Sequence, residues 1–320
     1  MGSSGSGSDK KMFWHEYRGC CDMSKIMKFF LFFMLMNVCV NKGITGEPKK
    51  TAIITCAEDC GMFRTMASVV GFLHLYEIGR YEGVAVDFET KGLYYDPEYG
   101  ENWWSYYFEP LSIGQIIPES CVKTVNGPAD TDCAMLTEFG LYKREVNVLL
   151  SKYVKLKPHI QAKVQEFTSR HFNGFPVIGI HYRGTDKSIE APRSEFEHIV
   201  EYVQGITQAL ISMDSDLMAD QVQIFIATDE DAFLEFMKIQ YGARVIYLEQ
   251  VIRSDSMHPV HKLAGNGYKK GEDALLDCLL LSQCNWLIKT SSNLSLFSTY
   301  FNPDMPVCHV TGRHWRLPME

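Results

Sequence analysis

Three short polar segments in the second half of the chain combine side chains that bind phosphate and hydroxyl groups. Residues 181–187 supply an arginine, an aspartate and a lysine, residues 228–231 supply acids, and residues 290–293 read Thr-Ser-Ser-Asn. An arginine fork matches phosphate oxygens in bidentate geometry, and hydroxyls with the free amides of a helix start bind anions. Together these segments predict a site for a diphosphate, whose negative charge grows when it departs as a leaving group.

Each polar segment follows a short apolar run that reads as a strand. The expected strands are 175–182, 222–227, 243–248, 286–289 and 306–310, and the expected helices between them are 194–213, 231–241, 272–284 and 293–300. Ser194, with Glu197 three residues on, is the expected N-cap of the first of these helices. The alternation predicts a parallel sheet with helices on both faces, where ligands bind at the carboxyl ends of the strands. The alternative for any one segment is an ordinary loop.

The first half begins a second sheet of the same kind. A β-branched strand at 51–56 leads through a polar loop into a helix at 63–78, which Gly79 ends, and a strand follows at 84–88. The aromatic stretch 93–110 fits either a wall that stacks sugars or the packed edge of a small domain, and we favour the second. Helical stretches are expected within 132–151 and at 160–172. We expect two Rossmann-like domains, 51–158 and 159–320, with the nucleotide in the second.

Composition excludes several classes of protein. The chain has 320 residues, ordinary apolar and charged fractions and a formal net charge of -8, which argues against a general nucleic-acid binder. Its ten cysteines show no zinc-type spacing. The absence of a G-x-G-x-x-G motif after the first strand argues against a dinucleotide oxidoreductase. The acids at 229–231 read as an ordinary acidic helix start, so we expect no metal.

Residues 1–50 are expected to be a tag, a targeting segment or an N-terminal extension. The first eight residues are rich in glycine and serine, and the stretch 23–40 places lysines before an apolar run. That order is typical of a signal peptide or signal anchor, and the alternative is a buried helix or strand. A signal or membrane anchor would place the protein in the secretory pathway or Golgi lumen, and otherwise it would be cytoplasmic.

The three polar segments resemble three motifs of the fucosyltransferase superfamily. That group includes α1,6-fucosyltransferases, nodulation fucosyltransferases and protein O-fucosyltransferases. The resemblance covers about residues 175–310, and Cys60-Gly-Met-Phe extends it weakly into the first half. It implies an inverting, metal-independent enzyme of the two-domain GT-B type that uses GDP-fucose as a substrate. A glycan or a protein hydroxyl would be the acceptor, and no cofactor would be needed.

The resemblance also implies roles for individual residues. It places Arg183 on the β-phosphate and Asp229 on the ribose or the guanine side, and it matches Asp186 and Lys187 to the Asp-Lys pair of the family. The nucleotide-sugar contacts that follow from the matched segments are His181, Arg183, Lys187, Asp229, Asp277, Ser291, Ser292 and Asn293. One departure stands out, because α1,6 enzymes carry a second arginine where this chain has Gly184. The departure leaves open a transferase that uses another nucleotide sugar, such as a xylose or rhamnose donor.

The catalytic group is expected to comprise Arg183, Asp186 and a carboxylate near the acceptor hydroxyl. Glu190, just after the first motif, is the first choice for that base, with Glu58 and Asp59 as alternatives from the first half. A carbohydrate-binding relative that has lost activity is the remaining alternative. The cations and serines retained in the motifs argue against it.

Overall fold

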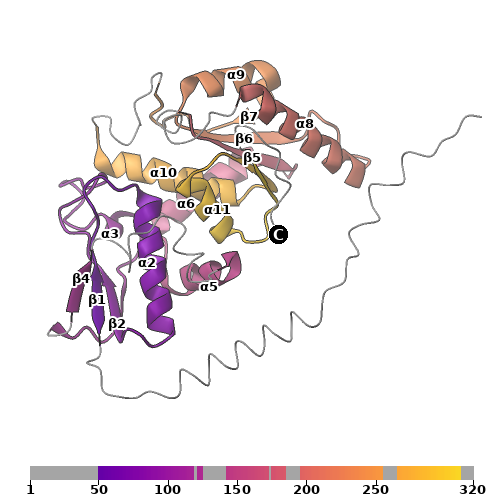
Figure 1. Ribbon diagram of the computed structural model, residues 1–320. Helices are drawn as coiled ribbons and strands as arrows, with labels where there is room; N and C mark the ends of the chain where they lie inside the picture. Colours follow the sequence, from indigo (N-terminus) through magenta and orange to yellow (C-terminus); the bar gives the residue numbers. More distant parts are fainter. Residues whose placement is uncertain are drawn as a thin grey trace, which may run out of the picture. The chain divides into compact units, whose positions relative to one another are not determined.

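The computed structural model describes residues 50–118, 121–124, 142–172, 174–184, 195–254 and 265–310. These residues form a mixed α/β protein with two sheets (Figure 1). The expectations for residues 1–50 fall almost wholly outside the described part. Among the described residues, no helix has both the length and the apolar character that a membrane crossing requires.

The first sheet has four strands in the order β3-β2-β1-β4. Strand β1 is parallel to β2 and to β4, and β3 runs antiparallel to β2. The strands are β1 (Thr51–Ile54), β2 (Gly83–Val86), β3 (Ser112–Gly114) and β4 (Cys121–Thr124). The strands expected at 51–56 and 84–88 are therefore present, and each ends two residues early.

Helix α2 (Met62–Glu77) packs its buried residues against this sheet and ends before Gly79, whose φ is 72°. The aromatic stretch then forms a short helix, α3 (Trp104–Tyr107). Trp103, Trp104 and Phe108 are 0% exposed. Because these rings have no accessible face, most of the stretch is packed interior and not a sugar-stacking wall.

The second sheet has five parallel strands in the order β7-β6-β5-β8-β9. They are β5 (Val177–Tyr182), β6 (Gln223–Thr228), β7 (Val245–Ile246), β8 (Trp286–Lys289) and β9 (Val307–His309). The chain winds outward from β5 through β6 to β7, then returns to place β8 on the other side of β5. The strand order therefore reverses between β5 and β8, which is where doubly wound sheets bind ligands.

Helices cover both faces of this sheet, as expected. The helices of this half are α6 (Pro158–His171), α8 (Phe196–Met213), α9 (Asp231–Tyr241), α10 (Gly267–Ser282) and α11 (Asn293–Phe301). Helix α5 (Lys143–Tyr153) precedes them and packs against α2 and α11. In Figure 1, α8 and α9 lie on one side of the strands, and α6 and α10 lie on the other. Apolar residues of α8 and α9 share one core cluster with the sheet, and apolar residues of α6 and α10 share another.

Three expectations for this half need correction. Helix α8 begins at Phe196 with Glu195 as its N-cap, so the cap predicted at Ser194 is wrong. Helix α10 begins five residues before the expected 272, because Asn266 caps it by accepting from the Lys269 N–H at 2.8 Å. The strand expected at 243–248 shrinks to β7, preceded by a 3₁₀ turn, η2 (Gly242–Arg244).

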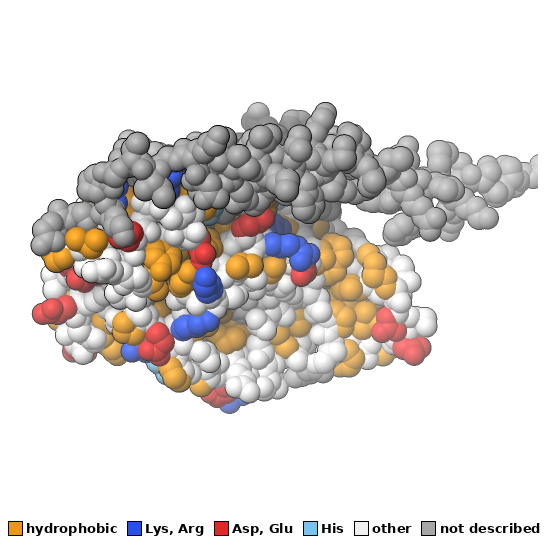
Figure 2. Space-filling view, turned by 90° about the horizontal axis from the view of Figure 1, so that it is seen from below, with side chains coloured by type: hydrophobic (Ala, Val, Ile, Leu, Met, Phe, Trp, Pro, Cys, Tyr) orange, Lys and Arg blue, Asp and Glu red, His pale blue; other side chains and the backbone are white. Residues whose placement is uncertain are grey.

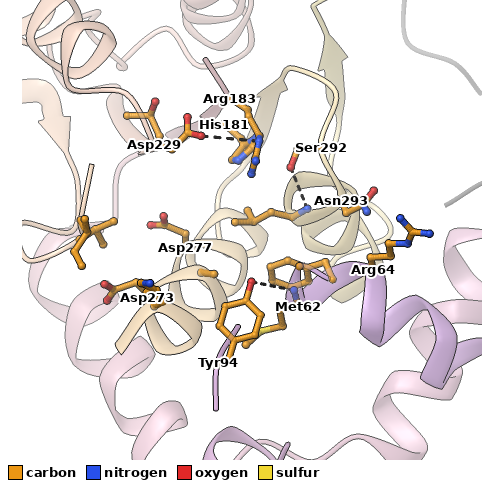
Figure 3. A pocket seen from close by; sticks show the side chains of 18 of the residues that line it. Met62, Arg64, Tyr94, His181, Arg183, Asp229, Asp273, Asp277, Ser292 and Asn293 are labelled. Carbon is orange, nitrogen blue, oxygen red and sulfur yellow. Dashed lines mark hydrogen bonds and ion pairs between the residues drawn. The ribbon is translucent and has the colours of Figure 1, made fainter. Parts of the chain in front are cut away.

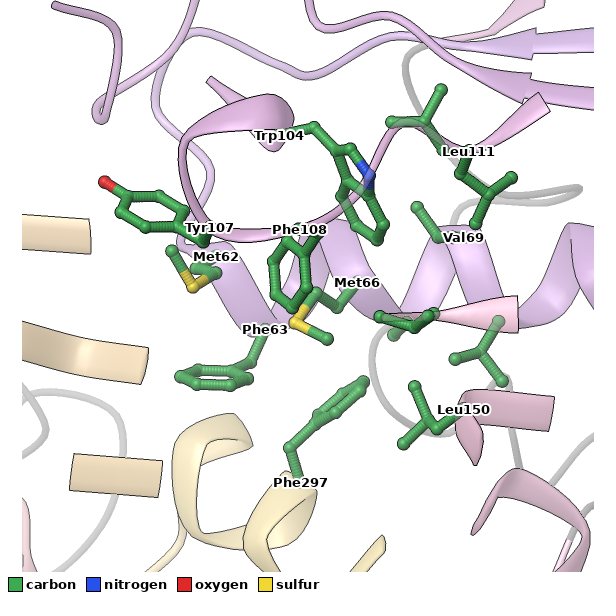
Figure 4. Packing of buried hydrophobic residues seen from close by; sticks show 14 of the residues in the cluster. Met62, Phe63, Met66, Val69, Trp104, Tyr107, Phe108, Leu111, Leu150 and Phe297 are labelled. Atoms are coloured by element: carbon green, nitrogen blue, oxygen red, sulfur yellow. The ribbon is translucent and has the colours of Figure 1, made fainter. Parts of the chain in front are cut away.

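A single apolar core joins the two halves. It contains residues of α2 and α5 together with Leu275 and Leu279 of α10 and Phe297 of α11. Figure 4 shows Phe297 facing Phe63 of α2 across this core. On the polar side, the Tyr107 hydroxyl donates to the Tyr268 carbonyl at 2.6 Å. Helix α10 therefore packs against both halves, which form one compact unit.

Candidate functional site

A cavity of about 480 Å³ opens at the carboxyl ends of β5 and β8. Its lining comes from both halves: the start of α2 on one side, and the ends of β5, β6 and β8 with one face of α10 on the other (Figure 3). The cavity therefore lies at the reversal of strand order in the second sheet. All three polar segments singled out in the sequence contribute lining residues.

Arg183 leaves β5 and reaches the cavity between two neighbouring strand ends. Its backbone N–H donates to Thr290 Oγ1 at 3.0 Å, and its Nε lies 3.9 Å from Asp229 Oδ2. The other oxygen of Asp229 accepts from the Gly184 N–H at 3.1 Å. The side chain of Arg183 is 26% exposed. The backbone of Arg183 is thus held at the end of β5, and its partly exposed side chain lines the cavity.

His181 is buried beside Arg183 and lines the same cavity. Burial, together with the positive charges of Arg183 and Lys289, lowers the pKa of its imidazole to about 3. Within the described part of the chain, its Nδ1 has no hydrogen-bond partner. The ring is consequently neutral at physiological pH and brings a polar atom, but no charge, to the cavity wall.

The Ser-Ser-Asn segment forms the start of α11, as the sequence predicted. Ser292 is the N-cap, and its Oγ accepts from the Leu294 N–H at 3.2 Å. The Ser291 hydroxyl lies 3.0 Å from His309 Nε2. Ser291, Ser292 and Asn293 all line the cavity. The positive end of the α11 dipole therefore faces the cavity, where it favours an anion.

Two carboxylates of α10 face the cavity from the other end. Asp277, which the sequence singled out, is 6% exposed, and burial raises its pKa to about 8. Asp273, one helical turn earlier, is 5% exposed, and burial raises its pKa as well. Sequence reasoning missed Asp273, although its spacing of four residues from Asp277 places both on one helix face.

The first half contributes residues that the sequence did not identify. The first turn of α2 lines the cavity from Gly61 to the exposed Arg64. Tyr94 is buried beside it, and its Oη accepts from the Met62 N–H at 3.0 Å. The short match around Cys60 and Gly61 was the available signal for this wall. Lys270, Val251 and Ile252 also line the cavity and were not predicted.

Residues 131–306 match the family model of nodulation protein Z, NodZ. The chain belongs to the NodZ family. Nodulation protein Z of Bradyrhizobium diazoefficiens is 26% identical over 153 residues, which cover 47% of this chain and 41% of the relative. Nodulation protein Z of Sinorhizobium fredii is 25% identical over 156 residues, covering 48% and 47%. The chain thus matches less than half the length of these curated relatives.

Solved structures share the fold of this NodZ-family chain. Fucosyltransferase NodZ from Bradyrhizobium superposes with a TM-score of 0.51 at 13% identity, covering 84% of this chain and 98% of that one. NodZ α-1,6-fucosyltransferase co-crystallized with GDP gives 0.50 at 15% identity, covering 82% and 95%. A variant of Arabidopsis thaliana FUT1 in complex with GDP gives 0.50 at 10% identity, covering 88% and 75%. The resemblance to fucosyltransferases drawn from the motifs is confirmed.

The remaining predicted residues of the NodZ-family site are either outside the described part of the chain or away from the cavity. Asp186, Lys187 and Glu190 lie outside the described residues. Glu58 and Asp59 are exposed on the turn after β1 and do not line the cavity. Across the described ranges, no group of three or more His, Cys, Asp and Glu side chains could hold a metal ion. Because Glu190 lies outside the described residues, its role as the acceptor base stays a prediction.

Gly184 has a steric explanation in this NodZ-family chain. A Cβ at this position would overlap the Glu230 carboxylate, which is itself only 9% exposed. Glu230 thus occupies the space that a side chain at 184 would need. On the uncovered part of the face in Figure 2, lysine and arginine side chains lie among acidic and hydrophobic ones.

Proposed function

We propose that this protein transfers fucose from GDP-fucose to a hydroxyl group of a glycan or a protein, with inversion and without a metal. We further propose a GT-B arrangement, with the donor nucleotide on residues 159–320 and the acceptor on residues 51–158. The observation that carries the proposal is the order of groups along the cavity. An arginine and a helix start lie at one end, and buried carboxylates lie at the other. Membership of the NodZ family supports the choice of donor.

The diphosphate belongs at the end formed by Arg183 and α11. Fucosyl transfer breaks the bond between the anomeric carbon and a β-phosphate oxygen, which keeps the electron pair. The Arg183 guanidinium and the amides at the start of α11 would offset this charge as it develops. Ser291, Ser292 and Asn293 complete that wall. In the proposal, Asp186 and Lys187 add polar contacts from the adjoining segment.

The nucleoside belongs at the α10 end. Asp277 is a buried acceptor that suits the N1–H of guanine, and Val251 and Ile252 line the cavity with apolar surface for the flat base. Asp229 accepts from the Gly184 N–H and lies near Arg183, and we assign it to a ribose hydroxyl next to the diphosphate. His181 supports this part of the nucleotide with a neutral polar edge.

The acceptor hydroxyl would attack from the side of α2. Its oxygen forms the new bond to the anomeric carbon on the face opposite the leaving phosphate, and its proton passes to a base, for which we propose Glu190. Arg64, Gly61 and Tyr94 line the cavity from that side. Gly184 supplies no cation to the diphosphate, so a different nucleotide sugar, with xylose or rhamnose, remains the second candidate donor.

A calorimetric panel of GDP, UDP and dTDP, each with and without chelator, tests the proposal. We expect selective binding of GDP that chelator does not change, followed by transfer from GDP-fucose to added acceptors. Preference for UDP or dTDP would overturn the donor. Loss of binding on chelation would overturn metal independence. Binding of GDP without any transfer or donor hydrolysis would favour the inactive relative.

A further inference from the structure

Two carboxylates on α10 share one face and one cavity. Asp273 and Asp277 are four residues apart, so their side chains lie one above the other on the helix. Both are more than nine-tenths buried, and both line the cavity. Figure 3 shows them across the cavity from Asn293 and Arg64. They therefore form a compact acidic end, separate from the arginine and helix-start end.

Each carboxylate keeps one oxygen without a hydrogen-bond partner among the described residues, Oδ2 of Asp273 and Oδ1 of Asp277. The other oxygen of Asp273 is paired with Lys269. An unpartnered buried acceptor is costly, because it has left water without gaining a replacement. Lys269 therefore satisfies Oδ1 of Asp273, and Oδ2 remains as an acceptor for a donor from a ligand.

The chemistry of guanine matches these acceptors. Its N1–H and exocyclic amino group present three hydrogens along one edge, whereas uracil and thymine carry no amino group. One carboxylate can accept two parallel N–H groups, so a third hydrogen needs a further acceptor. Two carboxylates one helical turn apart supply that arrangement. The apolar Val251 and Ile252, which line the same cavity, suit the faces of a flat base.

We propose that Asp273 is a specificity-determining residue that reads the exocyclic amino group of guanine through Oδ2. Asp277 takes the N1–H and one amino hydrogen, and Asp273 takes the remaining amino hydrogen. This assignment rests on the proposed function, because it requires a guanine nucleotide as the donor. It distinguishes guanine from hypoxanthine, which has the N1–H but lacks the amino group.

The test compares the calorimetric affinities of GDP and inosine diphosphate for the full chain and its variants. We expect the wild-type protein to prefer GDP, and Asp273→Ala to reduce the GDP-to-inosine-diphosphate ratio by at least about ten-fold, the worth of one hydrogen bond to a charged group. Asp273→Asn keeps the shape and a neutral oxygen and should reduce the ratio by less. Lys269→Met is the matched control, since it removes the ion pair but keeps the carboxylate, and it should keep the wild-type ratio.

The outcomes separate the inference from the proposed function. Equal weakening of GDP, inosine diphosphate and UDP by Asp273→Ala, or an unchanged ratio, would overturn the role of Asp273 and leave the donor intact. A ratio lowered as much by Lys269→Met would assign the effect to the ion pair and also overturn the role. A wild-type protein that binds UDP as well as GDP would overturn the donor, and the role of Asp273 with it.

Discussion

The two ends of the cavity differ in how their polar groups are satisfied before any ligand binds. At the Arg183 end, Asp229 Oδ1, the Arg183 N–H and the Ser292 hydroxyl all have partners within the chain. At the α10 end, Asp273 and Asp277 are buried, and each has an oxygen without a partner among the described residues. Apart from His181 Nδ1, which is buried without a partner among the described residues, the first end is preorganised, whereas both carboxylates of the second end carry a desolvation penalty that a ligand relieves.

This difference separates the expected roles of the two ends. A preorganised cationic end stabilises charge as it develops, so its loss should appear mainly in turnover. Unpaired carboxylate oxygens bind a ligand with matching donors more tightly, so substitution of these carboxylates should reduce mainly affinity and base selectivity. Substitutions at each end, measured on the same protein, can confirm or break this division.

The largest effect should come from Arg183→Ala. Loss of a charge-assisted phosphate contact should raise the transition-state barrier by roughly 2–4 kcal/mol, which corresponds to about 30- to 1,000-fold in turnover. The melting temperature should change little, because the side chain is partly exposed. Steady-state kinetics with GDP-fucose and thermal melting give the two readouts. Arg170→Ala, at an exposed arginine, is the control. Near-normal turnover in Arg183→Ala would show that this end does not carry the chemistry.

Asp277→Asn should weaken GDP binding by about ten-fold or more while stabilising the empty protein. Because the pKa of Asp277 is raised to about 8 by burial, its contribution to stability is full below the ordinary aspartate range and is lost as pH rises toward 8. Asparagine cannot ionise, so the variant should melt higher at pH 8 than the wild type. Thermal melting with and without GDP measures both effects. A variant that melts lower at pH 8 would contradict this account of the α10 end.

The affinity for GDP should increase between pH 6 and pH 8. The empty site holds a proton because the pKa of Asp277 is raised to about 8, mainly by burial, with Asp273 and Asp229 adding to the shift and Arg253 and Lys269 opposing it. Guanine donors require the ionised carboxylate, so binding must release that proton. Calorimetry in two buffers with different ionisation enthalpies should detect the release. Asp277→Asn should abolish it, and a proton count that this variant leaves unchanged would assign the release to another group.

The smallest effect should come from Ser292→Ala, which removes the N-cap of α11 and should cost about 1 kcal/mol of stability. Glycine caps helices nearly as well as serine, so Ser292→Gly should recover most of that loss. Urea unfolding measures the stability, and kinetics measure the effect on turnover. If the hydroxyl also contacts the diphosphate, both variants lose turnover alike. Turnover restored by glycine would restrict Ser292 to capping.

Much of the second half could be predicted from the sequence, because its elements are local and its polar segments directly follow apolar strands. Helix α9 and strand β8 have the expected bounds, and the three segments meet at one edge. The start of α10 was missed, since Gly267 and Gly271 look unfavourable inside a helix. The structure shows their use: a Cβ at either would overlap backbone near Tyr95 or the Tyr107 hydroxyl.

The rest of the site depends on contacts that sequence patterns do not encode. Asp273 lies inside a helix with no motif around it, and its inward direction follows from the way α10 packs. Tyr94 belongs to an aromatic stretch that is mostly interior, yet it reaches the cavity wall beside α2. Arg64 approaches from the first turn of α2, in the other half. Such residues are placed by long-range packing between the halves.

Helix α10 also limits how the protein can be divided. One of its faces presents Asp273 and Asp277 to the cavity, while Leu275 and Leu279 belong to the core shared with α2 and α5. A fragment containing only residues 159–320 would expose that apolar face to water, so it should aggregate instead of serving as a portable nucleotide-binding module. The halves should also melt in one cooperative transition. A first half taken from a relative should fold with this second half only when the α10 residues that pack against α2 and α5 are exchanged with it.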